Sequence, residues 1–563
     1  MSNQKRIQYP KTFVNSFLVY VRFKLSLISI VIVAFFLHFF SLDLKLFHHD
    51  EAIHSWFSYN LLTTGSWAYD PSYHGPFLYY VTAGMFSLFG ASDLVARILP
   101  ALFGFLLIPL IYAIYRLGYL NRGQTLIASL FVAISPDLVY FSRFLRHDIF
   151  MLFFTLLLLV AILAYLDRGQ TRYAIIAGLA AAGGMALKEE MPVILIIFAS
   201  FFLIALWKKK WTLPAQWKKD VVLSAAIAGV LLATLYSSFW FHPQTLVGDN
   251  FQLGLSGIHF QANTTGWYQA VDHWIAMHDE QRLGGPWFFY IPLFLLYELP
   301  IFILAIVGTS QFIVKDVPLT LYLRRCKNWL RTRKFEIPAS ELASTVALQL
   351  RCQRTGSNKT DDFFRFCIWW MLLTMAFYAY VGEKVPWLLI HQLLPMCFVA
   401  VYKLNWQKVA FALLGCVFLI VMTWHVAFIP ADISEPIVQV QNSEDMREVM
   451  GLMDNSSVVV IASSDYWPLP WYYRGDTWLK KIVLYGNSTD VDTLTQKNPG
   501  VIILHDTESY PSIAGYQKKT YKLDYWFSFD DNENRLPEYY LHRDGTLGSI
   551  NIDVFTPLPS GSS

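Results

Sequence analysis

Apolar segments long enough to cross a bilayer recur along most of this 563-residue chain. A membrane-spanning helix needs about 20 predominantly apolar residues. Hydrophobic residues make up 55% of the chain and charged residues only 15%. The sequence therefore predicts an all-α polytopic membrane protein with about eleven spans, near residues 25–42, 94–115, 124–142, 149–166, 173–188, 191–207, 221–241, 287–313, 366–381, 386–402 and 409–429.

Charge predicts how these spans are oriented. The first 24 residues carry five Lys or Arg and no acid, and they lead into an apolar run without a small-residue cleavage site. We therefore expect a retained first span and a cytoplasmic N-terminus. The first span then places residues 48–72 outside the cell membrane, and an odd total number of spans places the C-terminus outside as well. The aromatic segment 77–90 is short, and we expect it to lie at the membrane interface.

Composition changes near Pro430. Short β-rich runs at 457–461, 481–485 and 501–505 alternate there with helical patterns such as Ser443–Met453. Strands that alternate with helices predict a small α/β domain. We therefore divide the chain into a transmembrane domain, residues 1–429, and an extracytoplasmic domain, residues 430–563.

Two other patterns concern partners. Basic residues between 315 and 365 predict an amphipathic helix that meets anionic membrane lipid, although a solvated charged loop fits equally. The chain has no basic stripe of the kind that binds nucleic acid. Its five cysteines show no metal-ligand spacing and no paired framework.

The densest group of chemically active residues follows the first span. Within His48-His-Asp-Glu-Ala-Ile-His54, a helix that begins near Asp50 would place Asp50, Glu51 and His54 on one face. These residues have two interpretations. Asp50 could cap that helix, with Glu51 favouring its N-terminal dipole. Alternatively, the two carboxylates could take part in catalysis.

Cationic residues gather at the other predicted outer turns. Positive charge is otherwise rare on that side, so these residues call for an explanation beyond solvation, which is the usual role of single loop charges. An anionic ligand at the outer membrane boundary supplies one. The residues concerned are His74, Arg143, Arg146, His147, Lys188, His278, Arg282 and Lys384.

A phosphate carried by a lipid would account for both the charge and the depth of these groups. An outward-facing enzyme cannot use cytoplasmic nucleotide sugars, but a polyprenyl carrier can deliver a sugar through the bilayer. Transfer from a sugar phosphate needs cations at the leaving phosphate and a base for the acceptor hydroxyl. A divalent metal, Mg²⁺, Mn²⁺ or Zn²⁺, is a competing explanation, with His54 and Asp148 as ligands. The sequence has no HExxH or other fixed ligand spacing.

Several segments resemble the polyprenyl-phosphate-sugar transferases of the glycosyltransferase C fold. They are Asp50-Glu-Ala-Ile-His54, His74-Gly-Pro-Phe-Leu-Tyr-Tyr80, Ala96–Gly104, Arg146-His-Asp148, Lys188-Glu-Glu190, His278–Tyr290, Glu383-Lys-Val-Pro-Trp387 and His391. They look most like the archaeal-type flippase-activity-associated branch of the dolichyl-phosphate-mannose–protein mannosyltransferase superfamily. The resemblance spans residues 45–400 and continues in Ser464–Arg474.

The resemblance implies roles for particular residues. Asp50 would be the catalytic base, Glu51 its neighbour, and His391 would join the donor-binding group. It also implies inverting transfer. Two features depart from the pattern. Bacterial aminoarabinose transferases tend to have Lys where His74 stands, and this chain lacks the β-trefoil domain of eukaryotic protein mannosyltransferases.

Three functions remain open on the sequence. The first is inverting glycosyl transfer from a polyprenyl-phosphate sugar to a glycan, lipid or protein hydroxyl. The second is a lipid-linked sugar flippase or transporter, which charges within spans would favour, and Glu298 is the clear example. The third is a non-catalytic assembly partner that presents the outer domain.

Overall fold

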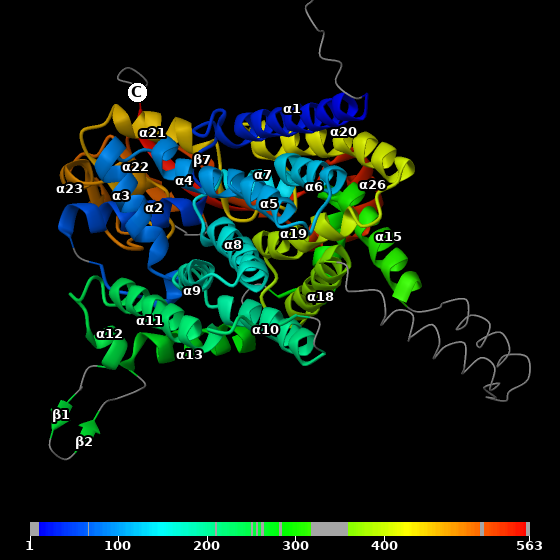
Figure 1. Ribbon diagram of the computed structural model, residues 1–563. Coiled ribbons are helices and arrows are strands. Elements are labelled where there is room, and N and C mark those ends of the chain that lie inside the picture. Colours follow the sequence, from blue (N-terminus) through cyan, green and yellow to red (C-terminus); the bar gives the residue numbers. More distant parts are fainter. Residues whose placement is uncertain are drawn as a thin grey trace, which may run out of the picture.

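A computed structural model describes residues 11–65, 67–208, 211–248, 252–254, 257–259, 264–280, 284–316, 359–506 and 512–558. Helices dominate up to residue 428, and a mixed sheet follows (Figure 1). The predicted basic helix at 315–365 lies almost entirely outside the described residues.

The helical part contains apolar helices joined by short turns. Its helices are α1 (Lys11–Phe39), α2 (His49–Thr64), η1 (Pro71–Tyr73), α3 (Phe77–Phe89), α4 (Asp93–Phe105), α5 (Leu107–Arg116), α6 (Arg122–Ile134), α7 (Pro136–Ser142), α8 (His147–Arg168), α9 (Thr171–Met185), α10 (Met191–Trp207), α11 (Trp217–Tyr236), α12 (Gln244–Val247), α13 (Gly266–Glu280), α14 (Tyr290–Tyr297), α15 (Leu299–Asp316), α18 (Lys359–Tyr380), η3 (Pro386–Leu388), α19 (Leu389–Ala400) and α20 (Trp406–Phe428). A two-stranded ribbon, β1 (Gln252–Gly254) and β2 (Gly257–His259), interrupts them.

Six helical segments of the described chain are long and apolar enough to span a membrane. The number rises to eight if each of two bent helix pairs counts as one span. One pair, α6 and α7, bends by 56° at Ser135; the other, α14 and α15, bends by 113° at Glu298. The protein is a multi-pass membrane protein, but the predicted count of about eleven spans is not confirmed.

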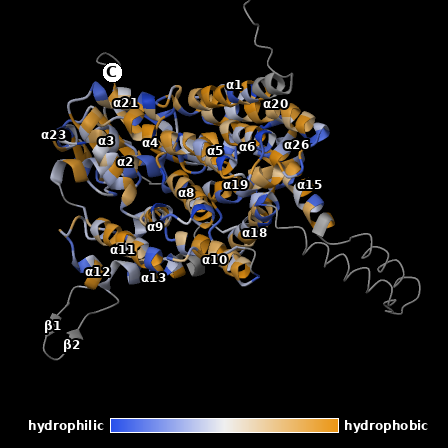
Figure 2. Ribbon diagram, in the orientation of Figure 1, coloured by the Kyte–Doolittle hydropathy of each residue, from blue (hydrophilic) through white to orange (hydrophobic). Residues whose placement is uncertain are grey.

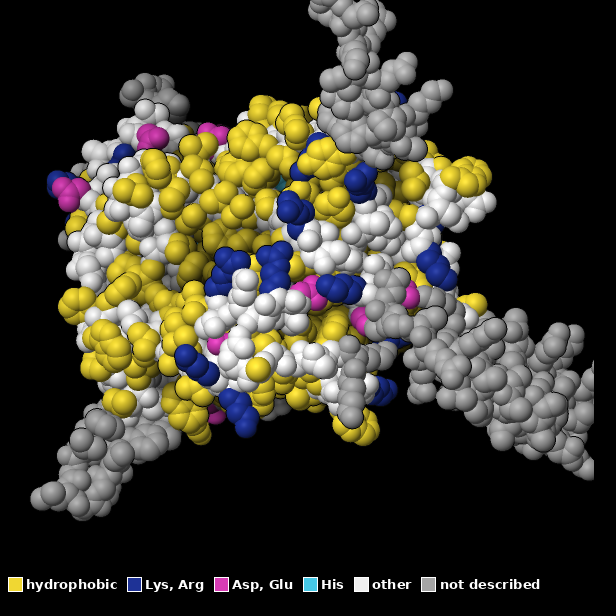
Figure 3. Space-filling view, in the orientation of Figure 1, with side chains coloured by type: hydrophobic (Ala, Val, Ile, Leu, Met, Phe, Trp, Pro, Cys, Tyr) yellow, Lys and Arg dark blue, Asp and Glu magenta, His cyan; other side chains and the backbone are white. Residues whose placement is uncertain are grey.

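The outer surface of the helical part suits a bilayer. Hydrophobic residues predominate along the helices (Figure 2), and apolar side chains spread over the face shown in Figure 3. Many are exposed outright, among them Ile196, Val222 and Leu414. Lipid can cover such side chains, whereas exposure to water would forgo the favourable free energy of burying apolar surface.

A six-stranded mixed sheet forms most of the C-terminal part, in the order β3-β7-β8-β6-β4-β5. The pairs β4–β5 and β4–β6 are parallel, and the remaining pairs are antiparallel. The sheet and its helices are β3 (Gln441–Asn442), α21 (Met446–Asp454), β4 (Val459–Ala462), α22 (Leu469–Tyr472), α23 (Asp476–Lys481), β5 (Ile482–Leu484), α24 (Val491–Thr495), β6 (Val501–His505), β7 (Tyr516–Phe527), α25 (Phe529–Asn532), η4 (Glu533–Arg535), α26 (Leu536–His542) and β8 (Leu547–Pro557).

Alternation along β4 explains why the sheet carries helices on both faces. Val459 and Ile461 pack on one face with apolar residues of α21, while Val460 and Ala462 pack on the other with Leu494 of α24. This period of two is the pattern of a strand that is buried on both faces. The domain boundary at residue 430 stays a prediction, and every strand of this sheet lies after it.

The sheet contacts the segment that leads into α2. Gln441 donates to the Leu46 carbonyl at 3.1 Å, and Asn442 donates to the Phe47 carbonyl at 2.6 Å. His48 forms an isolated antiparallel bridge with Gln441. Residues 46–48 therefore lie along β3, at one edge of the sheet, and the α2 N-terminus is fixed to the C-terminal part of the chain.

Candidate active site

Helix α2 begins with a capping box, and His48 rather than Asp50 is its cap. The ring Nδ1 of His48 accepts a hydrogen bond from the Asp50 backbone N–H at 3.0 Å, and Glu51 Oε2 accepts from the His48 N–H at 3.0 Å. The first turn is thereby satisfied without the Asp50 side chain. The interpretation of Asp50 as a helix cap is wrong, and its carboxylate is available for another partner.

That partner is Arg146, which comes just before α8. A guanidinium nitrogen of Arg146 is ion-paired with Asp50 Oδ2, and its Nε lies 3.3 Å from Asp148 Oδ2. The guanidinium also stacks 3.5 Å from the centre of the Trp387 ring, which fixes its plane. Burial raises the pKa of Asp50, but Arg146 and nearby histidines outweigh it and hold that pKa well below its usual range.

Lys188 supplies a second buried cation beside Arg146. It follows α9, and its Nζ lies 2.9 Å from Asp148 Oδ1 and 3.2 Å from Glu190 Oε1. Burial lowers the pKa of Lys188, but the two carboxylates more than compensate and raise it, so the ammonium remains charged. Asp148 thus holds both cations in place.

These groups line a polar cavity of about 260 Å³. Its walls come from the start of α2, the loop before α3, the turns before α8 and α10, helix α13, and the turn between α18 and α19. The lining includes His49, Asp50, His54, His74, Arg146, Lys188, Glu189, Glu190, His273, Glu383 and Trp387. Acidic and basic side chains therefore line the same cavity, which is large enough for a small polar ligand.

An apolar cavity of about 430 Å³ adjoins the polar one. The two cavities share Lys188, Glu189 and Trp274 in their walls. The remaining lining comes from α9 to α13 and is almost entirely apolar, with Leu232, Ala233 and Trp267 among its residues. One ligand with a charged head and a hydrocarbon tail could therefore occupy both.

Three histidines lie close together at the polar cavity, of which His54 and His74 line it and His147 is buried beside them. His74 Nδ1 lies 2.8 Å from Glu189 Oε2, and His54 Nδ1 lies 3.0 Å from the Tyr79 hydroxyl. The ring of His147 is fully buried at 5.0 Å from that of His54 and 5.2 Å from that of His74. Burial lowers the pKa of His54 to about 3, so this imidazole is neutral.

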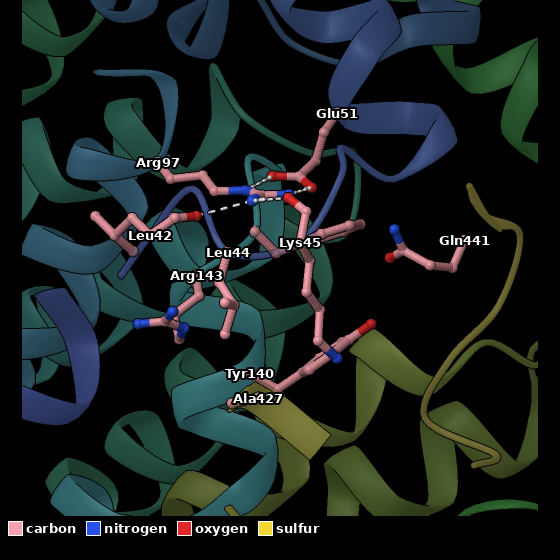
Figure 4. Close-up of a pocket in the computed structure, with 10 residues that line it drawn as sticks. Leu42, Leu44, Lys45, Glu51, Arg97, Tyr140, Arg143, Ala427 and Gln441 are labelled. Atoms are coloured by element: carbon pink, nitrogen blue, oxygen red, sulfur yellow. Dashed lines mark hydrogen bonds and ion pairs between the residues drawn. The ribbon is translucent and has the colours of Figure 1, made fainter. Parts of the chain in front are cut away.

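Glu51 lies outside the polar cavity. Its two carboxylate oxygens accept from Arg97 at 2.8 and 2.6 Å, and Oε1 also accepts from the Leu145 N–H at 2.8 Å. Arg97 in turn donates to the backbone carbonyls of Leu42 and Lys45 (Figure 4). It also donates to the carbonyl of Leu46. This arrangement makes Glu51 the anchor of the loop before α2.

Three more predicted donor-binding residues do not line the cavity. Arg143 donates to backbone carbonyls at the end of α1, including that of Ser41 at 2.6 Å. Lys384 donates to carbonyls at the end of α18, at 2.8 Å to that of Tyr378. His391 is buried behind Asp148, with Nε2 3.6 Å from Oδ1. The side chain of His278 and all of Arg282 lie outside the described residues.

Among the described residues, Asp148, Glu190 and His391 form a group able to hold a metal ion, because their ligand atoms lie within 4.8 Å of one another. Unpartnered atoms there, Glu190 Oε2 and both ring nitrogens of His391, suit Mn²⁺ or Zn²⁺. A bound ion would polarise a phosphate oxygen. Lys188 is already ion-paired with Asp148 and Glu190, so an ion would have to displace it. His54 is not part of this group, and the predicted metal stays a prediction.

Sequence reasoning gave no catalytic or donor-binding role to Arg97, His49 or Asp524, although the first two lie in segments that it singled out. Arg97 offered a signal, because an arginine within an apolar span is costly and needs a partner. His49 stood beside Asp50 without a distinguishing pattern. Nothing in the local sequence of Asp524 marks it, since its partner lies hundreds of residues earlier.

Comparisons with known proteins agree with this architecture. Residues 73–237 match the family model described as dolichyl-phosphate-mannose-protein mannosyltransferase. The crystal structure of ArnT from Cupriavidus metallidurans bound to undecaprenyl phosphate is 12% identical with a TM-score of 0.53, covering 95% of this chain and 98% of that chain. Its apo form is also 12% identical, with a TM-score of 0.51, covering 85% and 93%.

A third structure, the apo Archaeoglobus fulgidus oligosaccharyltransferase, is 14% identical with a TM-score of 0.47, covering 86% of this chain and 69% of that chain. No curated protein sequence matches the chain. Taken with the ArnT likeness along nearly the full length, the match over residues 73–237 identifies the chain as a protein of the glycosyltransferase C fold.

Proposed function

We propose that this protein is an inverting glycosyltransferase that moves a sugar from a polyprenyl-phosphate carrier to an acceptor hydroxyl. One observation carries the proposal: Asp50 and two buried cations line a polar cavity that adjoins an apolar cavity at Lys188. The polar cavity offers a base and a phosphate site. The apolar cavity offers a place for the lipid.

The donor fits the two cavities in one orientation. Its phosphate would lie at Lys188 and Arg146, since charge-assisted hydrogen bonds to these groups are the strongest available there. The first isoprene units would extend into the apolar cavity along Leu232, Ala233 and Trp267. The ArnT structure with undecaprenyl phosphate supports this donor class.

Catalysis would begin when the donor phosphate competes with Asp50 for Arg146. The carboxylate of Asp50, released from its ion pair, would take the proton of the acceptor hydroxyl, and the acceptor oxygen would attack the anomeric carbon. Arg146 and Lys188 would stabilise the charge on the leaving lipid phosphate. Direct displacement of this kind inverts the anomeric centre. In this scheme Glu51, held by Arg97, positions the loop that carries Asp50.

Orientation forms part of the proposal. We infer that the polar cavity and the sheet domain lie on the extracytoplasmic side, with the N-terminus in the cytoplasm, as the distribution of Lys and Arg predicts. The acceptor, a glycan, lipid or protein, would then approach from outside while the donor enters from the membrane.

The flippase alternative has less support. Glu298 is fully buried at the bend of α14 and α15, but its carboxylate accepts from the Ser135 hydroxyl at 2.5 Å and from the Asp137 N–H at 3.2 Å. It therefore joins the two bent helix pairs to each other, which gives this acid a structural role.

Transfer can be tested with the purified chain in lipid nanodiscs. The substrates are undecaprenyl- and dolichyl-phosphate sugars carrying radiolabelled hexoses or pentoses, with a membrane extract as acceptor. We expect label to move from carrier to acceptor with the wild type and with Asp43→Asn, an exposed acid of the same loop, and at least a hundredfold less with Asp50→Asn. Lipid scrambling in vesicles without any sugar transfer would reverse the proposal in favour of a flippase.

The lipid site has its own test. Ala233→Trp should fill part of the apolar cavity and weaken undecaprenyl phosphate binding, measured by thermophoresis, at least tenfold. Val222→Trp, about three turns away on the same helix and 70% exposed, should not. Equal affinities would exclude this cavity as the place of the prenyl chain.

A further inference from the structure

His49 and Asp524 form a pair that joins the sheet domain to the polar cavity. His49 is the first residue of α2, and its Nδ1 lies 3.4 Å from Asp524 Oδ2. The Asp524 side chain is 2% exposed, whereas that of His49 is 29% exposed and lines the same cavity as Asp50. A buried carboxylate thus lies beside an imidazole that lines the polar cavity.

An irregularity in β7 places Asp524 there. The β7–β8 register shifts between Lys522 and Asp524, which are paired with consecutive residues of β8, Asn551 and Ile550. An extra residue in one strand of a pair redirects the following side chain, and such bulges are common beside active sites. Asp524 also pairs in register with Asn442 of β3, the strand that holds the loop before α2.

Asp50 is a poor final destination for a proton. Its pKa lies well below the usual range, so a protonated Asp50 would pass its proton on at once. Burial lowers the pKa of His48 and that of His54, to about 4 and about 3. Burial also lowers the pKa of His49, but Asp524, Asp50 and Asp465 outweigh it and raise the value above its ordinary range. His49 is therefore the stronger base of these neighbours.

We propose that His49, oriented by Asp524, is the final acceptor of the proton that the acceptor hydroxyl loses. This inference rests on the proposed glycosyl transfer. The hydroxyl O–H bond breaks as its oxygen bonds to the anomeric carbon, and the bond from that carbon to the phosphate oxygen breaks with its electron pair on the lipid phosphate. The proton passes through Asp50 to the free ring nitrogen of His49 and then to solvent. Asp524 is a positioning residue.

The charge environment of His49 comes from several elements. Asp524 faces it from β7, Asp465 from the loop after β4, and Asp50 and His48 from the α2 N-terminus. The other titratable or charged groups of the cavity are His54, His74, Arg146, Lys188, Glu189, Glu190, His273 and Glu383. Only neutral His49 can accept a proton, so transfer should rise as pH increases through the pKa of His49.

Full-chain variants in nanodiscs test the proton path through the pH profile of transfer. His49→Gln should lose the rise and fall about a hundredfold in kcat at pH 8. Asp524→Asn should move the midpoint of the rise about one unit lower, because the imidazole loses its carboxylate. The control is Asp553→Asn, a buried acid of the neighbouring strand β8, whose partners Lys518 and Thr520 lie within the sheet. It should keep the wild-type midpoint.

Chemical rescue separates proton transfer from a structural role. Imidazole in the buffer should restore part of the transfer by His49→Ala and none of that by Asp50→Asn. An unchanged pH profile in His49→Gln would overturn the proposal. Loss of activity in Asp524→Asn without a shifted midpoint and without imidazole rescue would also overturn it. The same holds if the rise with pH disappears in His74→Gln or His273→Gln and not in His49→Gln.

A second measurement does not depend on transfer. Diethyl pyrocarbonate modifies neutral imidazoles, and mass spectrometry of the full chain can follow His49 alone as pH changes. The midpoint for His49 should lie above 6.5, the ordinary value, and should fall by about one unit in Asp524→Asn. An equal midpoint in both proteins would overturn the pairing, whether or not a donor has been found. If no donor supports transfer while the His49–Asp524 pairing is intact, the result would count against the proposed transfer and not against the pairing.

Discussion

At the scale of single residues, Asp50 and the proposed donor phosphate would compete for Arg146, which also pairs with Asp148. Its guanidinium is fixed between Asp50, Asp148 and the Trp387 ring. Charge on Asp50 would therefore compete with the proposed phosphate ligand. Because the pKa of Asp50 is held below its usual range, this competition should not change between pH 5 and 9.

Removing that charge should have opposite effects on binding and on catalysis. In Asp50→Asn we expect undecaprenyl phosphate to bind about tenfold more tightly, which corresponds to about 1.4 kcal/mol, while transfer collapses. Calorimetry on the full chain in nanodiscs measures the affinity. Asp43→Asn should leave it unchanged. Weaker binding in Asp50→Asn would show that Asp50 assists the phosphate site instead of competing with it.

Arg97 should matter for stability before it matters for activity. Arg97→Gln would leave the carboxylate of Glu51 buried without its cation, which typically costs about 3–5 kcal/mol. Thermal unfolding of the detergent-solubilised chain should show a clear loss of Tm. The half-exposed pair of Arg447 and Glu444 offers the matched control, and Arg447→Gln should change the stability by less than about 1 kcal/mol.

The sequence predicted that Asp50, Arg146 and Lys188 would gather, but it could not separate ligand-binding cations from structural ones. Arg143 and Lys384 sit at the ends of α1 and α18, where unpaired carbonyls attract cations. A cation in a loop can either bind a ligand or pair with the carbonyls at a helix end, and only its position in the folded chain decides which it does. The same holds for Glu51, which differs from Asp50 by one position and faces Arg97 instead of the cavity.

At the scale of elements, two turns must fit closely to form the polar cavity. The loop before α3 carries His74, and the turn between α9 and α10 carries Lys188 and Glu189. The Gly75 N–H donates to the Leu187 carbonyl at 3.0 Å, and a Cβ on Gly75 would come within 2.2 Å of the Ala186 carbonyl oxygen. Only glycine allows this approach.

Gly75→Ala should therefore separate the two turns and break the His74–Glu189 contact. We expect at least a tenfold loss of undecaprenyl phosphate affinity in a chain that still folds. Gly84→Ala on α3 is the control, since nothing lies within 4 Å of a Cβ there, and alanine suits a helix. If both variants bind as the wild type does, the turns have enough freedom to accommodate the methyl group.

Short helices explain why the number of spans was hard to predict. The predicted spans at 173–188, 191–207 and 386–402 fall on α9, α10 and α19, which have 15, 17 and 12 residues. A span needs about 20 apolar residues, but hydropathy alone marks such shorter segments as well. Strand prediction had a different gap. The buried strands β4 and β6 were visible as apolar runs, but the long strands β7 and β8 mix polar and apolar residues and pair only with each other and with distant strands.

At the scale of the whole molecule, the sheet domain contacts the helical part where α2 begins, beside the polar cavity. Composition predicted both parts and their order along the chain. It could not predict that the domain fixes the α2 N-terminus, because hydrogen bonds between residues about 395 positions apart leave no local pattern. The interpretation of the chain as a non-catalytic assembly partner that presents this domain fits these contacts poorly.

The interface should be needed for transfer. Asn442→Ala removes the hydrogen bond to the Phe47 carbonyl, so we expect the Asp50 loop to loosen and kcat to fall about tenfold. The control is Asn455→Ala, an asparagine of the same domain that bonds only its own helix at Gly451. Transfer by the two variants should differ while their circular dichroism agrees. Equal kcat values would show that the loop holds its shape without β3.

The bridge between His48 and Gln441 also affects how the protein is made. A ribosome synthesises the Asp50 loop early and β3 nearly four hundred residues later. The loop therefore lacks its anchoring strand throughout membrane insertion of the helices. A nascent chain would then have its lipid-facing segments in the bilayer but lack the proposed transfer activity. That activity would begin only after β3 has been synthesised.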